Sequence, residues 1–217
     1  MSASTQRLIL IATVLLMILF VLGNFFFTHI KPTSEYSLNT FNQPTLGNTK
    51  ASVELVVFED PKCASCKLYN SDIFPAIKKE YIDTNKIKYV NIPVSLMENS
   101  MDEVEALLCV YYQDEQKPSS ELFFKLLHIM YGVQGEKKTV DQILEIAKKE
   151  DPAFNLDKIK KCIERHVYFT KIKQNTAEAL RTMSNNKSLP ALFINGVRID
   201  ASNSETIFKA IDKASSK

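Results

Sequence analysis

Two cysteines separated by two residues, Cys63 and Cys66, are the residues of this chain best suited to chemistry. They stand between an apolar run at 53–58, rich in β-branched residues, and a segment at 67–81 whose apolar residues recur at helical spacing. Cysteines so placed at the start of a helix can close a small disulfide, and the helix N-terminus favours the thiolate of the first one. We interpret the pair as a redox centre, with Cys63 as the exposed reactive thiol and Cys66 as the resolving thiol.

The alternative chemistry for a close cysteine pair is zinc binding. Structural zinc usually takes four Cys or His ligands, commonly as two close pairs. Here the other two cysteines, Cys109 and Cys162, are far apart and neither begins a second pair. His166 lies one turn after Cys162, which could suggest a metal-binding pair. A histidine that is exposed, or whose hydrogen bonds are satisfied within the protein, is the simpler interpretation. We expect no metal and no cofactor beyond the redox-active cysteines, and two inert buried thiols are the remaining alternative.

A second motif, at residues 188–196, reads Ser-Leu-Pro-Ala-Leu-Phe-Ile-Asn-Gly and places Pro190 at the start of a short apolar strand. Proline is tolerated at the first residue of a strand, because no ladder hydrogen bond is lost there. Asn195-Gly196 is a strong hairpin signal, so strands at 191–194 and 197–200 are predicted to pair antiparallel. Thioredoxin-fold proteins carry a cis proline at this point, which favours cis for Pro190; an ordinary trans proline is the alternative.

The N-terminal segment indicates where the protein works. From Leu8 to Ile30 there is no Lys, Arg, Asp or Glu, and this run as a helix spans about 34 Å, enough for a bilayer core of roughly 30 Å. Residues 1–30 are therefore predicted to be a transmembrane signal anchor, reaching the membrane through 8–30. A cleaved signal peptide is the alternative, although no Ala-x-Ala pattern follows. A Cys-x-x-Cys pair outside the cytoplasm agrees with an oxidising, periplasmic or other extracytoplasmic compartment.

The remaining pattern predicts one α/β domain. A polar linker is expected at 31–50, followed by a domain at 51–217. Within it we expect strands at 53–58 and 86–94, an active-site helix at 64–82, four helices between 101 and 185, the hairpin, and a helix at 204–214. This order is a thioredoxin fold with a helical insertion at about 101–185. The formal net charge of +2 gives no reason to expect nucleic-acid binding.

Several stretches together resemble a known family over roughly residues 44–215. They are Leu46-Gly47-Asn48-x-x-Ala51-x-Val53, Phe58-x-Asp60-x-x-Cys63-x-x-Cys66-Lys67, Ala106-x-x-Cys109, the later Cys162, and Pro190-x-x-Phe193-Ile194-Asn195-Gly196. In this order they resemble the DsbA-like thiol–disulfide oxidoreductases, particularly the branch that includes BdbD. The resemblance implies an enzyme that exchanges disulfides with exported cysteine-containing proteins and is reset by a membrane redox partner.

Two departures from the family pattern bear on mechanism. The family often has a buried glutamate six positions before the first cysteine, where this chain has Val57. We therefore expect no buried carboxylate to assist proton transfer at Cys66. The dipeptide Ala64-Ser65 supplies no cation, so the pKa of Cys63 should be lowered mainly by the helix N-terminus. We therefore expect the Cys63–Cys66 pair to have an intermediate or reducing potential. Whether the chain acts as an oxidase or as a reductase or isomerase stays open.

The residues around the pair are expected to form a substrate groove. Pro190 shapes it together with Leu189, Ala64 and Ser65, and the backbone beside the proline is left to pair with an extended peptide by strand addition.

The two remaining cysteines have a separate expectation. With one bond assigned to the Cys-x-x-Cys pair, Cys109–Cys162 is the natural structural disulfide outside the cytoplasm, and free buried thiols are the alternative. The competing function is a non-catalytic thioredoxin-fold chaperone or binding module anchored at the membrane, which would need neither the Cys-x-x-Cys pair nor the matching proline.

Overall fold

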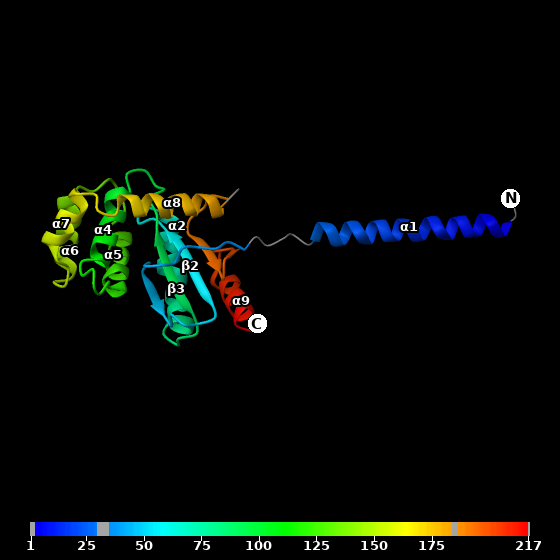
Figure 1. Cartoon of the computed structure of the whole chain (residues 1–217), viewed down its shortest axis with the longest axis horizontal. Helices are drawn as coiled ribbons and strands as arrows, with labels where there is room; N and C mark the ends of the chain where they lie inside the picture. The colour runs from blue at the N-terminus through cyan, green and yellow to red at the C-terminus, as the bar shows by residue number, and fades with distance from the viewer. Residues whose placement is uncertain (1–2, 30–34, 184–185, 217) are drawn as a thin grey trace. The chain divides into compact units, whose positions relative to one another are not determined.

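The computed structural model describes residues 3–29, 35–183 and 186–216. The chain divides into two units, one within residues 1–34 and the other within 35–217. The first is the single helix α1, Ala3–His29, and the second contains the sheet and the remaining helices (Figure 1). Over Ser4–Leu22, α1 is long and apolar enough to cross a membrane. The structure therefore places a helix where the transmembrane segment is predicted.

The sheet of the second unit has five strands in the order β1-β3-β2-β4-β5. Strand β2 pairs in parallel with β3, and every other neighbouring pair is antiparallel. The central β2 is buried almost throughout, as its continuous apolar run predicts. The hairpin β4–β5 forms as predicted, and β1 is a strand that the sequence analysis missed. The bounds are β1 Thr45–Gly47, β2 Glu54–Glu59, β3 Lys88–Pro93, β4 Ala191–Ile194 and β5 Val197–Ile199.

The polar linker predicted at 31–50 is wrong from Glu35 onward; residues 31–34 lie outside the described part. Glu35 bridges to Val197 in β5, and the end of the segment forms β1. Backbone groups of this polar stretch pair with the edges of the sheet. Such pairing does not depend on side-chain type, so the composition of the segment does not predict it. Gly47 is required in β1 because its φ is +77° and a Cβ would lie 2.4 Å from the Ile87 oxygen.

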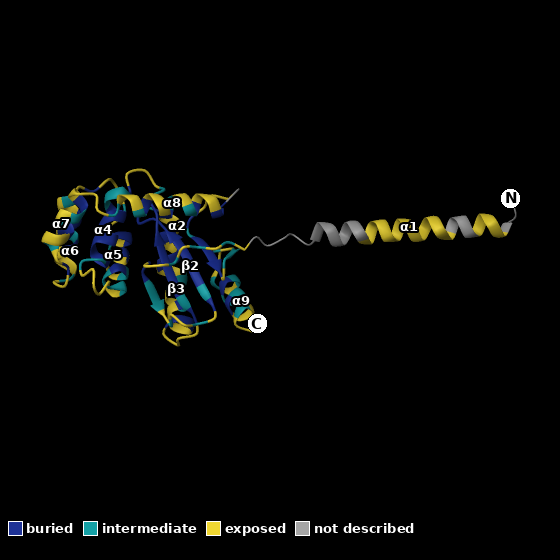
Figure 2. Cartoon of the chain, viewed as in Figure 1, coloured by how far each residue is buried: buried dark blue, intermediate teal, exposed yellow. Residues whose placement is uncertain are grey.

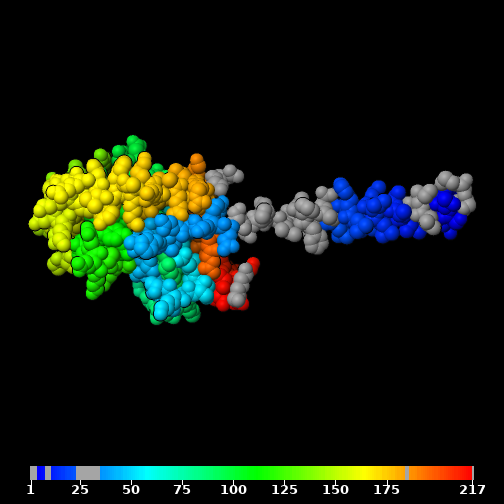
Figure 3. Space-filling view, viewed as in Figure 1, coloured from blue at the N-terminus to red at the C-terminus, as the bar shows by residue number. Residues whose placement is uncertain are grey.

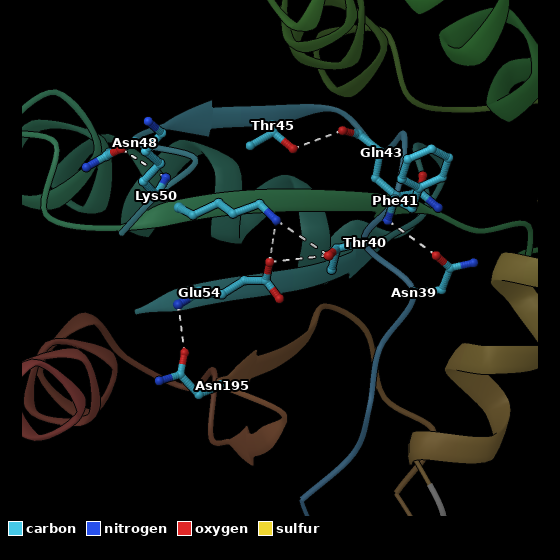
Figure 4. Close-up of polar contacts among 10 residues, drawn as sticks. Asn39, Thr40, Phe41, Gln43, Thr45, Asn48, Lys50, Glu54 and Asn195 are labelled. Carbon is cyan, nitrogen blue, oxygen red and sulfur yellow. Dashed lines mark hydrogen bonds and ion pairs between the residues drawn. The ribbon is translucent and has the colours of Figure 1, made fainter. Parts of the chain in front are cut away.

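Side chains also fasten this N-terminal segment to the folded unit. Thr40 Oγ1 donates to Glu54 Oε2 of β2 at 3.3 Å (Figure 4). Glu54 is in turn tied to the hairpin, because Asn195 Oδ1 accepts from the Glu54 N–H at 2.7 Å. Farther from the sheet, the Asn39 N–H donates to Glu178 in the helical insertion. Figure 3 shows this light-blue segment on the surface beside the green and yellow insertion. The segment therefore links the insertion to the sheet.

The active-site helix is interrupted rather than continuous over 64–82. It consists of α2 (Ala64–Leu68), the π-helical η1 (Tyr69–Ile73), α3 (Phe74–Ile77) and the π-helical η2 (Lys78–Ile82). Pro75 explains the break: it has no N–H to donate to the carbonyl of Ser71 and so interrupts the α-helical ladder.

The helical insertion contains five helices where four are predicted. The fourth predicted helix is split into α7 and α8, because His166 adopts φ +51° and ends the regular backbone. The buried Glu105 holds this junction by accepting from the Tyr168 N–H at 3.0 Å. The helices are α4 Met101–Tyr111, α5 Ser120–Gly132, α6 Val140–Glu150, α7 Leu156–Glu164 and α8 Phe169–Met183, followed after the hairpin by α9 Ser204–Ser215.

Apolar side chains fill a core on each face of the sheet. Figure 2 shows the buried residues in dark blue along the sheet and the helices of this unit. Val56 and Phe58 of β2 face the insertion, where Leu107 of α4 is fully buried. Val57 faces the opposite core, together with Ile207 of α9. The alternation of β2 side chains thus fixes the insertion on one face and α3 and α9 on the other. The carboxyl end of β2 leads directly into the cysteine pair.

Candidate redox site

Cys63 caps the N-terminus of α2 immediately after the central strand. Its sulfur accepts a hydrogen bond from the Cys66 N–H at 3.2 Å, and its own N–H donates to the Asp60 carbonyl at 3.0 Å. Neither cysteine is disulfide-bonded in this structure. The strand, the tight turn and the helix start therefore bring both thiols to one point, as the sequence predicts.

Cys63 is not the exposed thiol that the sequence analysis expects. The residue is 4% exposed and Cys66 is 0% exposed. The insertion contacts the turn that carries Cys63, because Gln134 Nε2 donates to the carbonyls of Pro61 and Cys63 at 2.8 and 3.0 Å. Sequence spacing cannot show this contact, since Gln134 lies 71 residues after Cys63.

Asp60 fixes the turn that precedes the cysteines. Its fully buried carboxylate accepts from the Leu96 N–H, the Met97 N–H and Ser100 Oγ, each at 2.8 Å, and its other oxygen accepts from the Lys62 N–H. Because Leu96, Met97 and Ser100 follow β3, these hydrogen bonds join the turn after β2 to the loop after β3. Asp60 is thus a structural residue beside the redox pair.

The Cys63 thiol is acidified by specific hydrogen bonds. Its pKa is lowered from 9.0 to about 6, chiefly by the hydrogen bond from the Cys66 side chain and further by Ser65 and the Cys66 N–H, while burial and Asp60 oppose the change. We expected the helix N-terminus to dominate. Because α2 has only five residues, the individual donors matter more.

Cys66 behaves in the opposite way. Burial raises the pKa of its thiol well above the usual range, and its hydrogen bond to Cys63 and the nearby Glu59 raise it further. In the reduced pair the proton is therefore held on Cys66 while Cys63 ionises. This asymmetry separates an attacking sulfur from a resolving one.

A buried carboxyl group does stand beside the pair, contrary to the expectation drawn from Val57. Glu59 is 1% exposed and accepts hydrogen bonds from Asn70, Asn91 and Tyr131. Burial raises its pKa from 4.5 to about 8. Since strand side chains alternate, Glu59 lies on the same face of β2 as Val57, two residues nearer the cysteines. An acidic residue ending an apolar strand is the signal that the sequence analysis overlooked.

The Leu189–Pro190 peptide bond is cis, as predicted. Ser65 Oγ donates to the Leu189 carbonyl at 2.7 Å and lies 3.2 Å from Cys63 Sγ. The α2 helix and the proline loop, 124 residues apart in sequence, are thereby joined at the redox pair.

A groove of about 910 Å³ opens beside this contact. Ser65, Leu189 and Pro190 line it, whereas Ala64 is exposed at the start of α2 and does not. Residues between the end of β5 and the start of α9 also line it, including Asp200 and Asn203. The groove is therefore partly polar, and neither Cys63 nor Cys66 is among its lining residues.

The second pair, Cys109 and Cys162, is joined by a disulfide between α4 and α7. The His166 Nδ1 atom lies 2.9 Å from the Glu105 carboxylate. Among the described residues, no group of three or more His, Cys, Asp or Glu side chains is arranged to hold a metal ion.

A sheet of this topology, a Cys-x-x-Cys pair capping a helix and an adjacent cis proline define the thiol–disulfide oxidoreductase class. Residues 39–213 match the model of a family described as "Thioredoxin". The chain belongs to this family and falls in its DsbA-like, BdbD-like group.

Individual relatives agree with this assignment. The chain is 27% identical over 190 residues to a Rickettsia prowazekii protein named as a protein-disulfide oxidoreductase, covering 85% of this chain and 66% of the relative. It is 26% identical over 207 residues to a Bacillus cereus protein named "Probable disulfide bond formation protein D", covering 90% and 91%. The match to a second rickettsial relative, from Rickettsia typhi, spans 62% of that protein's length.

Solved structures show the same fold. The crystal structure of Chlamydia trachomatis DsbA superimposes with a TM-score of 0.74 at 25% identity, covering 84% of this chain and 96% of that one. Oxidised BdbD from Bacillus subtilis gives a TM-score of 0.72 at 23% identity, covering 85% and 98%.

Proposed function

We propose that this chain forms disulfides in exported proteins by cycling Cys63 and Cys66 between disulfide and dithiol. The observation that carries the proposal is the asymmetric pair: Cys63 is acidified at the start of α2, next to a cis proline, while Cys66 is buried and keeps its proton. Stabilising the reduced thiolate makes the corresponding disulfide a better oxidant. The geometry therefore favours transfer of a disulfide from this chain to its substrate.

The proposed reaction has two exchange steps. A substrate thiolate attacks Cys63 Sγ, the Cys63–Cys66 bond breaks, and the electron pair goes to Cys66. A second substrate thiolate then attacks the substrate sulfur of the mixed disulfide and releases Cys63 as a thiolate. Two electrons pass from the substrate cysteines to the pair, and the substrate gains one disulfide.

Glu59 is proposed to supply the proton that Cys66 takes up in the first step. Its pKa of about 8 keeps the carboxyl largely protonated at neutral pH, and in its ionised form it raises the pKa of the Cys66 thiol. In the reverse direction the same carboxylate accepts the Cys66 proton. The role matches a general acid and base whose pKa lies near the working pH.

The apolar helix α1 and the thiol–disulfide oxidoreductase class together indicate the compartment, redox partner and substrates of the reaction. We propose that α1 anchors the protein in the cytoplasmic membrane with the redox domain on the extracytoplasmic side, and that a membrane redox partner reoxidises the pair. The substrates are exported cysteine-containing proteins that present an extended segment to the Ser65–Pro190 groove. The Cys109–Cys162 bond suits the same oxidising compartment.

Equilibration of the purified chain with glutathione redox buffers tests the direction. A disulfide-forming protein should be reduced by glutathione at low concentration and should oxidise a reduced model protein such as denatured ribonuclease. A potential as low as that of thioredoxin, roughly −270 mV, would contradict the oxidising direction. If replacing both cysteines by Ala leaves the biological activity intact, the non-catalytic binding module is the correct function instead.

A further inference from the structure

The Ser65 hydroxyl lies between two acceptors that belong to different parts of the site. Its oxygen is 2.7 Å from the Leu189 carbonyl oxygen and 3.2 Å from Cys63 Sγ. A hydroxyl group has one proton to donate and two lone pairs that accept. Ser65 can therefore donate to the carbonyl or to the sulfur, but not fully to both.

The charge of Cys63 decides which acceptor receives that proton. While Cys63 is a thiol, its S–H can donate to Ser65 Oγ, and Ser65 donates to the Leu189 carbonyl. Once Cys63 ionises, the sulfur is a charged acceptor, and hydrogen bonds to charged groups are stronger than those to neutral ones. Ser65 is exposed and can rotate toward the sulfur, which also agrees with its part in lowering the Cys63 pKa.

Rotation of Ser65 leaves the Leu189 carbonyl without this donor. Leu189 is 7% exposed and lines the groove next to Pro190, just before β4 begins. A shielded carbonyl that loses its donor costs free energy until another donor replaces the lost one. The backbone N–H of an extended peptide in the groove is such a donor.

We propose that Ser65 is a positioning residue that couples ionisation of Cys63 to peptide binding at the Leu189 carbonyl. When Cys63 is a thiol, Ser65 occupies the carbonyl and opposes peptide pairing. When Cys63 is a thiolate, Ser65 turns to the sulfur and the carbonyl accepts the peptide. By linkage, the peptide in turn stabilises the thiolate by the same factor. This inference rests on the proposed function and concerns the reduced chain, in which Cys63 is either a thiol or a thiolate.

The first test is a titration of the thiolate absorbance of the full-length reduced chain. Ser65→Ala removes the donor and should raise the Cys63 pKa by about one unit. Ser65→Thr keeps a hydroxyl and should restore the native titration. If Ser65→Ala leaves the titration unchanged, the hydroxyl stays on the Leu189 carbonyl in both states and the proposal fails.

The second test measures binding of the capped peptide acetyl-Ala-Thr-Ser-Thr-Ala-amide, which has no cysteine and no titratable group. The native chain should bind it several-fold more tightly above the Cys63 pKa of about 6 than below it. In Ser65→Ala the carbonyl is always available, so binding should be equally tight on both sides of the titration; Ser65→Thr should recover the step.

Other outcomes would overturn the coupling. A native chain whose peptide affinity has no step through the Cys63 titration contradicts it. So does an equal step in Ser65→Ala, because the thiolate charge alone would then explain the effect. Neither measurement uses disulfide exchange. Loss of exchange with glutathione in the native chain would refute the proposed function and leave these two results interpretable.

Discussion

At the scale of single residues, the two cysteines differ because their surroundings differ. Cys63 receives hydrogen bonds from Cys66 and Ser65, while Cys66 is enclosed beside Glu59. The Cys63 thiol therefore ionises readily and is nucleophilic, whereas the Cys66 thiol keeps its proton. Two predictions concern this asymmetry and the carboxyl group beside it.

We expect Cys66→Ala to accumulate mixed disulfides with substrate proteins, because the resolving thiol is absent, whereas Cys63→Ala should trap none. The Cys63 pKa should also rise in Cys66→Ala, since the leading hydrogen bond that lowers it is lost. Non-reducing electrophoresis after acid quenching detects the adducts, and thiolate absorbance measures the pKa. Equal trapping by both variants would contradict the assigned roles.

Glu59→Gln should change the pH dependence of stability. Between pH 4.5 and about 8 the folded chain keeps a proton on Glu59 that the unfolded chain has released, so this group makes the free energy of unfolding fall as pH rises. Gln does not titrate. The free energy of unfolding of Glu59→Gln relative to the native chain should therefore increase by about 3 kcal/mol from roughly pH 5 to 8.

Urea unfolding of the reduced proteins at several pH values measures this difference. Glu205→Gln, at an exposed carboxylate on α9 that pairs with Lys209, is the matched control and should show no such trend. From its oxidised state, the same Glu59→Gln protein should form mixed disulfides with substrate more slowly, because the proposed proton donor to Cys66 is missing. A constant stability difference across the pH range would show that Glu59 is ionised in the folded chain.

At the scale of elements, the site is assembled from the ends of segments that are far apart in sequence. The carboxyl end of β2 supplies Glu59, the start of α2 supplies Cys63, and the loop before β4 supplies Leu189. The insertion reaches the same point through Gln134, just after α5. The insertion thus contacts the redox site and also forms a separate layer on the sheet.

The disulfide between α4 and α7 should support the insertion without taking part in exchange. Replacing Cys109 and Cys162 together by Ala should lower the free energy of unfolding by about 4 kcal/mol, as the loop-closure estimate for 53 residues gives. The glutathione equilibrium of Cys63 and Cys66 should change little. Urea unfolding and redox titration of the same double variant check both parts; a large shift in that equilibrium would show coupling between the pairs.

At the scale of the whole molecule, we propose different tasks for α1 and the unit within residues 35–217. Helices of the second unit cover both faces of its sheet and form the hydrophobic cores described for it. The second unit starts at Glu35, which forms a β-bridge with Val197 of β5. Membrane attachment and redox chemistry should therefore be separable.

A fragment of residues 35–217 should be soluble after export to an oxidising compartment and should keep the thermal midpoint and glutathione equilibrium of the detergent-extracted full chain. The full chain should sediment with membranes and resist extraction by carbonate. A fragment starting at residue 51, the boundary predicted from sequence, lacks β1 and should be less stable. Equal thermal midpoints for the two fragments would show that β1 contributes nothing to stability.

The sequence by itself determined the features whose signal is local. Two cysteines three positions apart between a strand and a helix predict the redox pair, and the apolar strand ending at Asn195-Gly196 predicts the hairpin. The cis bond at Pro190 was expected from the likeness to thioredoxin-fold proteins. Hydrophobic periodicity gave most strands and helices, because burial of one face repeats every two or 3.6 residues. It failed at Pro75 and His166, where single residues interrupt the backbone pattern.

Only the tertiary structure decided the properties that depend on neighbours distant in sequence. Burial raises the pKa of Glu59, and nothing in its own segment requires that burial. Asn70, Asn91 and Tyr131, which come from other elements, donate hydrogen bonds that partly oppose the rise. Gln134 donates to the Cys63 carbonyl across 71 residues, and Ser65 donates to the Leu189 carbonyl across 124 residues. Desolvation and hydrogen bonding act over a few ångströms in space, so the chemistry of this site is fixed by contacts that sequence spacing does not reveal.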